Sequence, residues 1–503
     1  MTVTEKINWE KIHKILSKEP KTTNRTAHYI NPPKKHKPQT PARAIFFDSE
    51  SIVHKENYQH EPYLLAANFV DYAYKKVIKK VYGSEKARQK SKDIIDLKNF
   101  WLDINKFTLQ RQTLWIFAHN IGYDLLATGG LQTLFEIGYV SVSYPYENGA
   151  TFIFEIARKN PKRFCSKCKI EKPCEECIKK PVYINKIRFV STTNYYNTSL
   201  KNLGDIFGLE KTHQKQDEKF DFSRLDEYDI NKVINYCVRD TDIIQLAMES
   251  LFKQCENGEV TKFGSFKNTI PAMSFSAFQT WFIKPNQLHV TDNNLAINLE
   301  RNAYFGGRTE VWKRGIFKET IIGVDINSMY PSIMLKNKFP TQLLNTRSNI
   351  SVAELKRYIN RGYLVTAEVV IKTESENPYP MRYNNRLVFP IGQFETTIST
   401  PEVIYGLERD HIIKVKNVAI YKADYIFKDF VQHFYTARQK NRDNPVLNYL
   451  FKLILNSLYG KFGQLKREWI EVGESNIKTL KTEEQIIIKE GKQQEINLKT
   501  IGG

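Results

Sequence analysis

Three acidic residues near the N-terminus are spaced so that their carboxylates could gather around metal ions. Asp48 and Glu50 are two positions apart at the end of ARAIFFDSES, an apolar run typical of a β-strand with charges at its tip. Because strand side chains alternate, both carboxylates would point to one face. Asp124 follows a second predicted strand and a turn at residues 120–122, and it would lie at the start of a helix.

A further acidic residue lies on a predicted helix over residues 229–254, where Tyr236 and Asp240 are four positions apart and share a face. Mg²⁺ prefers oxygen ligands, and two Mg²⁺ ions can stabilise both the attacking and the leaving oxygen of a phosphodiester. The phenol of Tyr236 could orient the attacking water. Each piece alone is weak, because acids at strand ends are usually solvated, but together they predict a metal-dependent hydrolytic site.

The same pieces resemble the three motifs of the 3′–5′ proofreading exonuclease in family B DNA polymerases, as FDSE, NIGYD and YCVRD. The resemblance implies an RNase H-like fold. It also implies metal ligands at Asp48, Glu50, Asp124 and Asp240, a water-positioning Tyr236, and a substrate contact from Asn120. SLKNL, which begins with Ser199 and Leu200, resembles the primer-terminus motif of protein-primed members. The alternative for Ser199 is the N-cap of an ordinary helix.

Two further segments resemble polymerase elements of that family. VDINSMYPS at 324–332, predicted as a strand followed by a turn and a helix, resembles motif A. This implies that Asp325 binds the catalytic metal ions and that Tyr330 lies under the incoming sugar and excludes a ribose 2′-OH. YFGG resembles the YxGG element that contacts the template, with Tyr304, Gly306 and Gly307. The glycines would allow the backbone to approach DNA closely.

KLILNSLYGKFG at 452–463 resembles motif B of the same family. Lys452, Asn456 and Tyr459 are spaced to lie along one helix face. The lysine could neutralise triphosphate charge, and the tyrosine could pack on the nascent base pair. Lys440, on the preceding predicted helix, is a candidate second phosphate ligand. An amphipathic helix with incidental Lys and Tyr is the alternative.

The family's second polymerase carboxylate pair, motif C of the form YxDTD, is not found after motif B, and the one DTD lies upstream at 240–242. Two-metal nucleotidyl transfer needs further carboxylates, so we expect polymerisation to require a second chain. A split gene, an interrupted gene and a piece of a longer sequence all remain open. The predicted function is a DNA-directed DNA polymerase with a proofreading exonuclease, which uses Mg²⁺, primer–template DNA and dNTPs. The alternatives are an exonuclease with a DNA-binding relic palm and a non-enzymatic DNA-binding replication protein.

The predicted architecture is α+β: an RNase H-like exonuclease of α/β type, then a family B palm and fingers, with the thumb absent. The expected boundaries are a basic flexible arm at 1–41, the exonuclease at 42–265 with a metal-binding insertion at 160–180, the first part of the palm at 266–335, an insertion at 336–430, the fingers at 431–463 and a truncated return to the palm at 464–503. The insertion and SLKNL resemble the protein-primed branch of phages, linear plasmids and organelles, whose insertion contacts a terminal protein.

The charge balance agrees with a polyanionic partner. The 503 residues carry 75 Lys+Arg against 55 Asp+Glu, a formal net charge of +20. Self-repulsion of this size favours nucleic acid as partner, although a generally lysine-rich proteome is the alternative. No apolar run reaches the ~18 residues of a membrane span, and the charged N-terminus lacks the apolar core of a signal peptide. We therefore expect an intracellular protein, in the host cytoplasm if viral, with an organelle also open.

Four clustered cysteines form two CxxC pairs, Cys165, Cys168, Cys174 and Cys177. This spacing predicts a small structural zinc hairpin, because four thiolates suit tetrahedral Zn²⁺. An iron–sulfur cluster and free surface cysteines are the alternatives. Cys237 and Cys255 are interpreted as ordinary helix residues.

Overall fold

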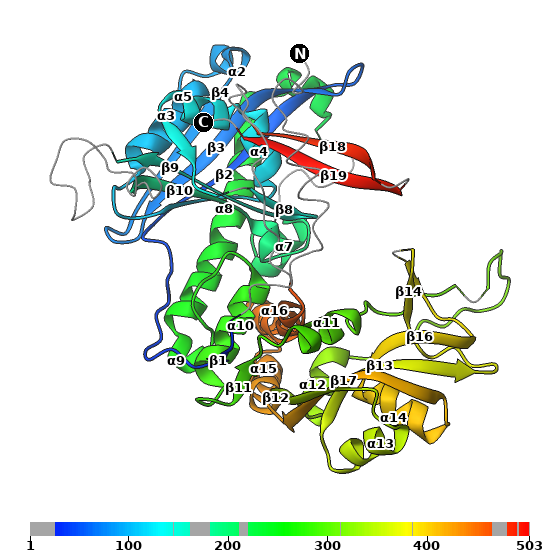
Figure 1. Cartoon of the computed structure of the whole chain (residues 1–503). Helices are drawn as coiled ribbons and strands as arrows, with labels where there is room; N and C mark the ends of the chain where they lie inside the picture. Colours follow the sequence, from blue (N-terminus) through cyan, green and yellow to red (C-terminus); the bar gives the residue numbers. More distant parts are fainter. Residues whose placement is uncertain are drawn as a thin grey trace, which may run out of the picture. The chain divides into compact units, whose positions relative to one another are not determined.

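The computed structural model describes residues 26–143, 145–160, 182–210, 220–311, 313–384 and 386–464, and the backbone of two strands at 480–489 and 492–501. The chain divides into two compact units, the first built around residues 37–273 and the second around 274–465. Figure 1 labels many of the helices and strands of both units.

The first unit is built on one mixed sheet, which has nine strands in the described residues. Its order is β5-β4-β3-β2-β6-β10-β9-β7, with β8 paired to β9. β2 pairs antiparallel with β3 and parallel with β6, and β6 pairs parallel with β10. The bounds are β2 Arg43–His54, β3 Gln59–Asp71, β4 Lys76–Gly83, β5 Ile95–Asp96, β6 Leu114–Ala118, β7 Tyr139–Ser141, β8 Tyr146–Asn148, β9 Thr151–Lys159 and β10 Tyr183–Ser191.

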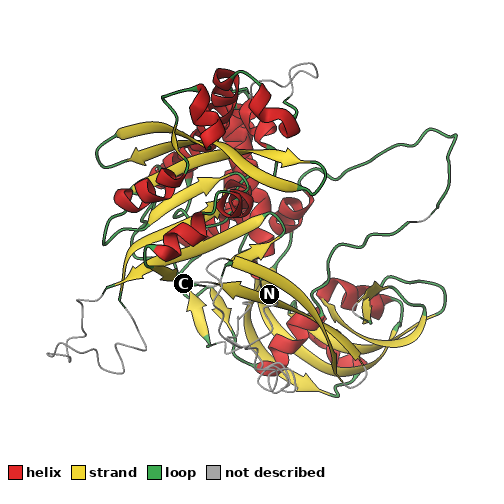
Figure 2. Cartoon of the chain, turned by 90° about the horizontal axis from the view of Figure 1, so that it is seen from above, coloured by secondary structure: helices red, strands yellow, loops and turns green. Residues whose placement is uncertain are grey.

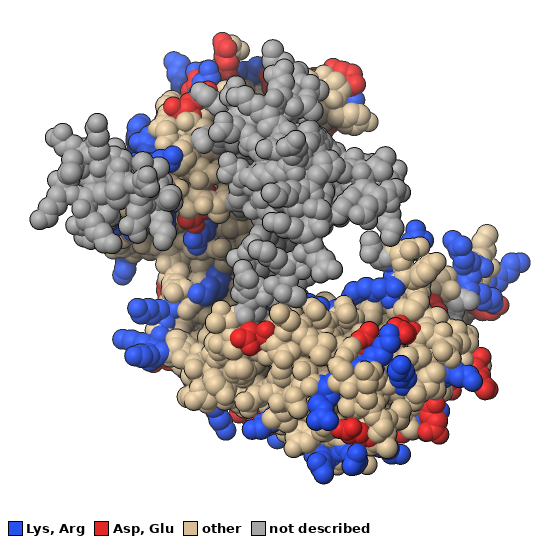
Figure 3. Space-filling model, in the orientation of Figure 1, with Lys and Arg blue, Asp and Glu red and all other residues tan. Residues whose placement is uncertain are grey.

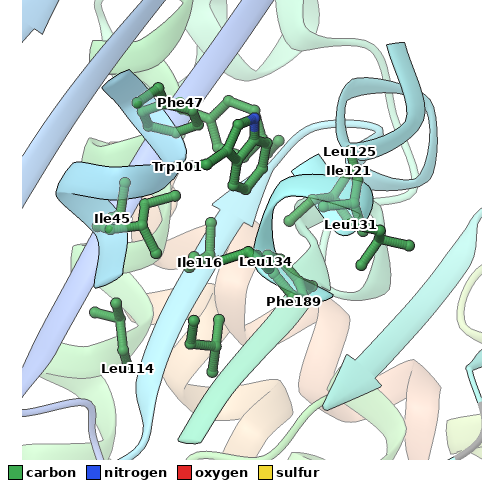
Figure 4. Packing of buried hydrophobic residues seen from close by; sticks show 14 of the residues in the cluster. Ile45, Phe47, Trp101, Leu114, Ile116, Ile121, Leu125, Leu131, Leu134 and Phe189 are labelled. Carbon is green, nitrogen blue, oxygen red and sulfur yellow. The ribbon is translucent and has the colours of Figure 1, made fainter. Parts of the chain in front are cut away.

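One face of this sheet is covered by three helices, α3 (Lys98–Phe107), α4 (Ile121–Ala127) and α5 (Gly130–Glu136), all drawn in blue to cyan in Figure 1. Figure 4 shows the core between them, where side chains of β2 and β6 meet Trp101 and the leucines of α4 and α5. Trp101 is 1% exposed, and Phe47 packs edge-on against its ring. Burying aromatic side chains of this size dominates the stability of such a core.

The opposite face is covered by the long helix α8 (Ile230–Glu256), which lies against β2 and β3. Its Val233 and Cys237 pack on Leu64 and Ala66 of β3 in a separate apolar cluster. The Thr241 hydroxyl donates to the Ala66 carbonyl at 3.2 Å, which fixes the helix on the strand. The helices predicted from the sequence at 229–254 and after Asn120 are thus confirmed. Among the described residues, this unit also contains the helical segments α2 Glu85–Lys90, α7 Leu200–Phe207, α9 Gly258–Thr261, η2 Thr192–Asn194 and η4 Phe222–Glu227.

The second unit contains a four-stranded antiparallel sheet of order β12-β17-β13-β16. Its strands are β12 Phe339–Ser348, β13 Leu364–Thr373, β16 Gly392–Ser399 and β17 Ile412–Asp424. Two helices pack on it, α13 (Val352–Asn360) and α14 (Thr400–Glu408), around a core that includes Leu355, Val369 and Val418. A small hairpin of β14 (Met381–Tyr383) and β15 (Arg386–Val388) accompanies the sheet.

Helices form much of the rest of the second unit. α15 (Lys428–Lys440) and α16 (Pro445–Phe462) are separated at the Asn-Pro pair, as the sequence predicts, and Asn444 caps α16 by accepting from the Leu447 N–H at 3.0 Å. Phe278 of α10 (Ile270–Trp281) packs among other aromatic rings. The centroid of its ring lies 5.2, 6.1 and 6.0 Å from those of Phe427, Phe430 and Phe462. α11 (Asn294–Asn302) and α12 (Met329–Lys336) complete this unit.

The expected flexible arm at 1–41 is wrong for its described residues. Residues 28–40 are not a free arm, because β1 (His28–Ile30) pairs with β11 (Leu288–Val290) and the Pro38 carbonyl accepts from the Phe266 N–H at 2.6 Å. The Pro/Lys stretch begins at Asn31, after β1, so its composition does not prevent His28–Ile30 from adding to a strand that offers free backbone groups.

The strand expected before Pro331 does not form either. Apart from Trp312, which lies outside the described residues, the connection between α11 and α12 is loop, as Figure 2 shows in green. A β-strand requires a neighbour for its backbone hydrogen bonds. In the part of the chain that the structure describes, no strand lies against residues 319–326. The helix that follows is confirmed as α12.

No helix in the described ranges combines the length and apolar character that a membrane span needs. Figure 3 shows Lys and Arg side chains spread among Asp and Glu over the visible described surface. Over the described residues visible in this view, the basic side chains are therefore scattered and do not form one continuous basic field.

Candidate functional site

The acid pair of the first unit lies in the middle of β2, and not at a strand tip. β2 continues to His54, and Asp48 and Glu50 are paired across the ladder with Ala66 and Leu64 of β3. On the other side, β6 accompanies β2 only as far as Phe46. The acids therefore lie just beyond the last residues of β2 that pair with β6, while β6 itself stays paired with β10 as far as Ala118.

A thiol joins this pair. A carboxylate oxygen of Asp48, one of Glu50 and the Sγ of Cys237 all lie within 4.8 Å of one another. Glu50 is 8% exposed and Asp48 is half-buried, so the group is reached from solvent through Asp48. Two oxygen donors on one strand face fit the preference of Mg²⁺ for carboxylates.

Asp124 enters from α4, which begins after β6 ends. Its carboxylate accepts the Ser49 hydroxyl at 2.6 Å, and Ser49 lies between the two acids of β2. Asp124 is 4% exposed. Burial raises the pKa of Asp124 to about 7, while hydrogen bonds from the Ser49 hydroxyl and backbone work in the opposite direction. The third predicted acid is therefore tied directly to the strand that carries the first two.

Electrostatic effects on two neutral side chains place both of these side chains near the β2 pair. Burial and the charges of Asp124, Glu50 and Asp48 raise the pKa of the Tyr123 phenol. Burial and the charges of Asp48, Glu50 and Asp240 raise the pKa of the Cys237 thiol. Tyr123 and Cys237 thus both lie in the field of the β2 pair, with Asp124 acting on one and Asp240 on the other.

Asp240 and Tyr236 lie on α8 as predicted. Asp240 is 1% exposed, and Tyr236 is half-buried with its ring edge-on to Phe220 at a centroid distance of 5.3 Å. Asp242 has a different environment, because it accepts from Lys79 at 2.6 Å and from Asn68 at 2.8 Å. The DTD at 240–242 is therefore divided between a buried acid, Asp240, and an ion-paired acid, Asp242, that fixes α8 to the sheet.

Two predicted contacts of the first unit lie at helix starts. Asn120 is the N-cap position of α4. Ser199 is the N-cap of α7, where its hydroxyl accepts from the Asn202 N–H at 3.2 Å, so the structural alternative for Ser199 is confirmed. Leu200 is buried at 7% exposure. The primer-binding role of the SLKNL segment stays a prediction.

In the second unit three tyrosines from distant segments gather. The rings of Tyr330 on α12 and Tyr459 on α16 stack at 4.9 Å with an interplanar angle of 25°. Burial and the phenols of Tyr304 and Tyr330 raise the pKa of Tyr459, so Tyr304 lies nearby. Gly463 makes room for the Tyr304 ring, because a Cβ at this position would lie 2.5 Å from it. Each of the three tyrosines is 41–48% exposed, which leaves an aromatic surface open to a ligand.

The face of α16 that carries this tyrosine also carries Lys452 and Asn456, as the spacing predicts. All three are exposed, while Ile454, Leu455 and Leu458 on the other side are buried. Lys440 is exposed at the last residue of α15. The amphipathic alternative is therefore correct as a description of the helix, and it leaves the polar face available.

Asp325 is not positioned by secondary structure. It lies in the loop before α12, exposed to solvent, beside Val324 at 92% and Ile322 at 80% exposure. Gly306 and Gly307 lie in the same long connection, and a Cβ added to either would meet no atom within 4 Å.

Arginines link the start of this connection to the β14–β15 segment. Arg382 packs over the Phe305 ring at 4.9 Å, and Arg308 packs over the Phe389 ring at 4.2 Å. Cation–π contacts of this kind hold the chain beside Tyr304, whereas residues 319–326 have no such contact among those that the structure describes.

Sequence reasoning missed three side chains near the acids. Ser49 could have been suspected, because it lies between Asp48 and Glu50. His60, whose Nδ1 lies 2.6 Å from the Tyr123 hydroxyl, has no sequence signal, since strand pairing brings it there from β3. The sequence indicates only a helical position for Cys237, and nothing in its spacing predicts its place beside Asp48 and Glu50. The four cysteines at 165–177 lie outside the described residues.

Residues 209–496 match the family model of DNA polymerase type B, organellar and viral. A probable DNA polymerase from Ascobolus immersus is 27% identical over 293 residues, which is 54% of this chain and 23% of that protein. The DNA-directed DNA polymerase of Enterobacteria phage PRD1 is 30% identical over 175 residues, which is 33% of this chain and 28% of that protein. The chain thus spans about a quarter of the length of these curated relatives.

The fold is similar to that of phi29 DNA polymerase. The complex of that enzyme with primer–template DNA and incoming nucleotide aligns with a TM-score of 0.59 at 15% identity, covering 92% of this chain and 74% of that one. The complex with single-stranded DNA aligns with a TM-score of 0.58 at 17% identity and the same coverage. With the family model matching more than half of the residues, the chain belongs to the organellar and viral type B DNA polymerases.

Proposed function

We propose that this chain carries the 3′–5′ exonuclease and part of the polymerase active site of a DNA-directed DNA polymerase that replicates a viral or plasmid-like replicon. The observation that carries the proposal is the close placement of Asp48 and Glu50 on β2. Asp124 is hydrogen-bonded to the intervening Ser49, and Asp240 is buried on α8, the helix that lies against the same strand. Family membership supports the class of substrate, and the formal charge of +20 suits DNA.

In the exonuclease, Asp48 and Glu50 would hold Mg²⁺, with Asp124 and Asp240 completing the acid set. The order β4-β3-β2-β6-β10, with β3 antiparallel to a parallel β2-β6-β10 group, supports an RNase H-like domain. Bound Mg²⁺ would supply charge neutralisation on the scissile phosphate. The Ser49 hydroxyl would fix the Asp124 carboxylate, and the half-buried Tyr236 phenol would orient the attacking water.

In the polymerase part, the stacked Tyr330 and Tyr459 would receive the incoming dNTP and the nascent base pair. Lys452 and Lys440 would neutralise the triphosphate. Tyr304, Gly306 and Gly307 would contact the template. Asp325 would hold Mg²⁺ only together with further carboxylates on strands that pair with residues 319–326. We propose that these strands come from a second chain or from a longer form of this one.

Three further proposals concern the primer, a structural metal ion and the replicon. The SLKNL segment and the sheet at residues 339–424 support a protein-primed mechanism with a terminal protein. The two CxxC pairs support Zn²⁺ at residues 165–177. The family's description as organellar and viral supports a phage, linear-plasmid or organellar replicon.

The test is Mg²⁺-dependent activity of the purified chain on a labelled primer–template, with and without dNTPs. Shortening of the primer that is lost in the Asp48→Ala/Glu50→Ala double variant is the expected result. Extension by this chain alone would mean that other carboxylates complete the site around Asp325. Absence of both activities, with tight DNA binding retained, would instead support a non-enzymatic replication protein.

A second candidate is an exonuclease with a DNA-binding relic palm. The solvent-exposed loop position of Asp325 favours it, because a metal-binding carboxylate is normally held by ordered neighbours. A primer that is shortened but never extended, even when extracts of the replicon's other proteins are added, would support this candidate.

A further inference from the structure

A soft metal donor lies among the hard donors of the proposed exonuclease site. The Sγ of Cys237 and carboxylate oxygens of Asp48 and Glu50 are within 4.8 Å of one another. Among the described residues, this is the one group of three or more His, Cys, Asp or Glu side chains that meets this distance. β2 supplies the two acids and α8 supplies the thiol, so the group forms only when helix and sheet have packed.

The thiol is held in place by its surroundings. Cys237 is 0% exposed, and its Sγ donates to the Asp48 carbonyl at 3.3 Å. One turn further along α8, the hydroxyl of Thr241 donates to the carbonyl of Ala66 on the neighbouring strand. A rotation of Cys237 away from the acids would therefore have to displace packed atoms of the α8–β3 contact.

This donor set and a pure carboxylate site prefer different cations. Carboxylate oxygens suit Mg²⁺, whereas a thiolate selects softer cations, and Zn²⁺ accepts sulfur and oxygen ligands together with tetrahedral geometry. Cd²⁺ shares this preference for sulfur. These three side chains would supply three of the four ligands that tetrahedral Zn²⁺ takes.

We propose that Asp48, Glu50 and Cys237 form a binding site for a thiophilic divalent cation, and that Zn²⁺ bound there competes with Mg²⁺ and inhibits the exonuclease. This inhibition rests on the proposed exonuclease function, whereas the binding does not. On binding, a metal–sulfur bond forms, the S–H bond breaks, and the proton leaves to solvent. The second cysteine of α8 provides a matched control. Cys255 is equally buried, but it belongs to no such donor group among the described residues.

Binding is measured by titrating Cd²⁺ into the full chain and recording the sulfur-to-cadmium charge-transfer absorption in the ultraviolet. Wild type is compared with Cys237→Ser, Cys237→Ala and Cys255→Ser, because any cadmium at the four cysteines of 165–177 cancels in the difference. We expect one Cd²⁺ per chain to be lost in both Cys237 variants and none in Cys255→Ser. Equal cadmium signals in wild type and the Cys237 variants would overturn the proposal. A wild-type signal that remains undiminished in the Asp48→Asn/Glu50→Gln double variant would also overturn it, because the acids would then not be ligands.

A variant that fails to fold would lose the signal for another reason, so thermal unfolding is recorded for each. If both Cys237 variants unfold, cadmium binding at Cys237 can still be tested on the wild-type chain by thiol alkylation. Cd²⁺ should slow alkylation of the Cys237 thiol relative to the Cys255 thiol, read by mass spectrometry of their peptides under mild denaturant. Equal alkylation of the two thiols with and without Cd²⁺ would overturn the proposal.

Inhibition is measured as exonuclease rate at fixed Mg²⁺ with increasing Zn²⁺, each variant being normalised to its own rate without Zn²⁺. We expect the half-inhibiting Zn²⁺ concentration to rise about tenfold or more in Cys237→Ser, as for loss of a metal-site contact, and to stay unchanged in Cys255→Ser. An unchanged value in Cys237→Ser would overturn the inhibition. If no variant has activity in Mg²⁺, the proposed function fails, and the cadmium result remains a separate test of the site.

Discussion

Two acidic motifs of this chain differ in backbone conformation: one lies on a strand and the other in a loop. Asp48 and Glu50 lie within a twelve-residue strand whose ladder to β3 runs past both of them. Asp325 lies in a loop, and the apolar residues around it, such as Val324, are exposed. Both segments have the same sequence character, an apolar run followed by an acid. The difference is that one run has strand neighbours in the described residues and the other does not.

This difference shows what an apolar run before an acid requires. A strand holds its side chains in place because its backbone is hydrogen-bonded to its neighbours, and its apolar residues gain free energy only when a second layer covers them. β2 has both, with α3 to α5 on one face and α8 on the other. Residues 321–326 have neither in the part of the chain that the structure describes, and contiguous exposed apolar residues of this kind mark an interaction surface.

The largest expected effect separates the two acid motifs by activity. Asp48→Ala should reduce exonuclease turnover roughly 1000-fold, since metal stabilisation of transition-state charge is worth several kcal/mol. Asp325→Ala should leave exonuclease turnover near the wild-type value, because Asp325 belongs to the other motif. The measurement is release of the 3′-terminal nucleotide from labelled single-stranded DNA. A comparable loss in both variants would contradict the assignment of Asp48 to a separate site.

Substitutions in the two apolar runs should change the free energy of unfolding by very different amounts. Phe47→Ala on β2 removes a fully buried ring and should lower the free energy of unfolding by about 3–5 kcal/mol. Val324→Ala, at 92% exposure, should change it by less than about 0.5 kcal/mol. Urea unfolding followed by circular dichroism measures both. A large loss in Val324→Ala would mean that residues 319–326 are covered by another layer in solution.

The raised pKa of Asp124 predicts a pH dependence of stability in the metal-free chain. The folded state keeps the Asp124 proton up to about pH 7, whereas the unfolded chain releases it near its usual value of about 3.9. Because the folded state then binds more protons, the free energy of unfolding should fall as pH rises from about 4 to 7, by a few kcal/mol at most. Urea unfolding in EDTA at several pH values should show this fall in wild type and a flatter profile in Asp124→Asn.

Asp103 is a control in the same unit, because its pKa is shifted in the opposite direction to that of Asp124. Burial works against its ionised form, but hydrogen bonds from Lys80, Lys106 and Tyr82 outweigh burial and lower the pKa of Asp103. Its stabilisation is present above the unfolded value and lost as pH falls below about 4. Asp103→Asn should therefore leave the fall between pH 4 and 7 in place. If Asp124→Asn also leaves that fall unchanged, the buried carboxylate is not its source.

The smallest effect concerns the three-tyrosine surface of the second unit. Gly463→Ala would place a methyl 2.5 Å from the Tyr304 ring, and the ring end of this partly exposed side chain can move. The free energy of unfolding should change by about 1 kcal/mol or less, but primer–template affinity should fall a few-fold, because stacking on an aromatic ring contributes about 1–3 kcal/mol per base. Fluorescence anisotropy of labelled primer–template measures the affinity.

Gly460→Ala tests whether any added methyl on α16 has this effect. Its methyl would meet open space, and alanine is the better helix former by about 1 kcal/mol. The chain should therefore become slightly more stable. Equal losses of primer–template affinity in the two glycine variants would show that the position of Tyr304 is not responsible.

The sequence predicted the local elements that carry the candidate residues. The DxE pair on a strand, Asp124 after a turn, the long helix with Tyr236 and Asp240, and the Asn-Pro break before α16 all follow from short-range rules of periodicity, capping and turn formation. The family followed from motifs with fixed spacing, and the family model confirms it. The roles of the individual site residues stay predictions.

Only the tertiary structure decided which of these elements meet. Strand pairing brings His60 to Tyr123 and sets Ala66 beside Asp48, and helix packing brings Cys237 to the acid pair. The same requirement for a neighbour left residues 319–326 as loop, although their composition is that of a strand. Composition and spacing determine which conformation a segment can adopt. Whether it adopts that conformation, and which side chains it then contacts, depends on hydrogen bonds and apolar contacts from residues far away in the sequence.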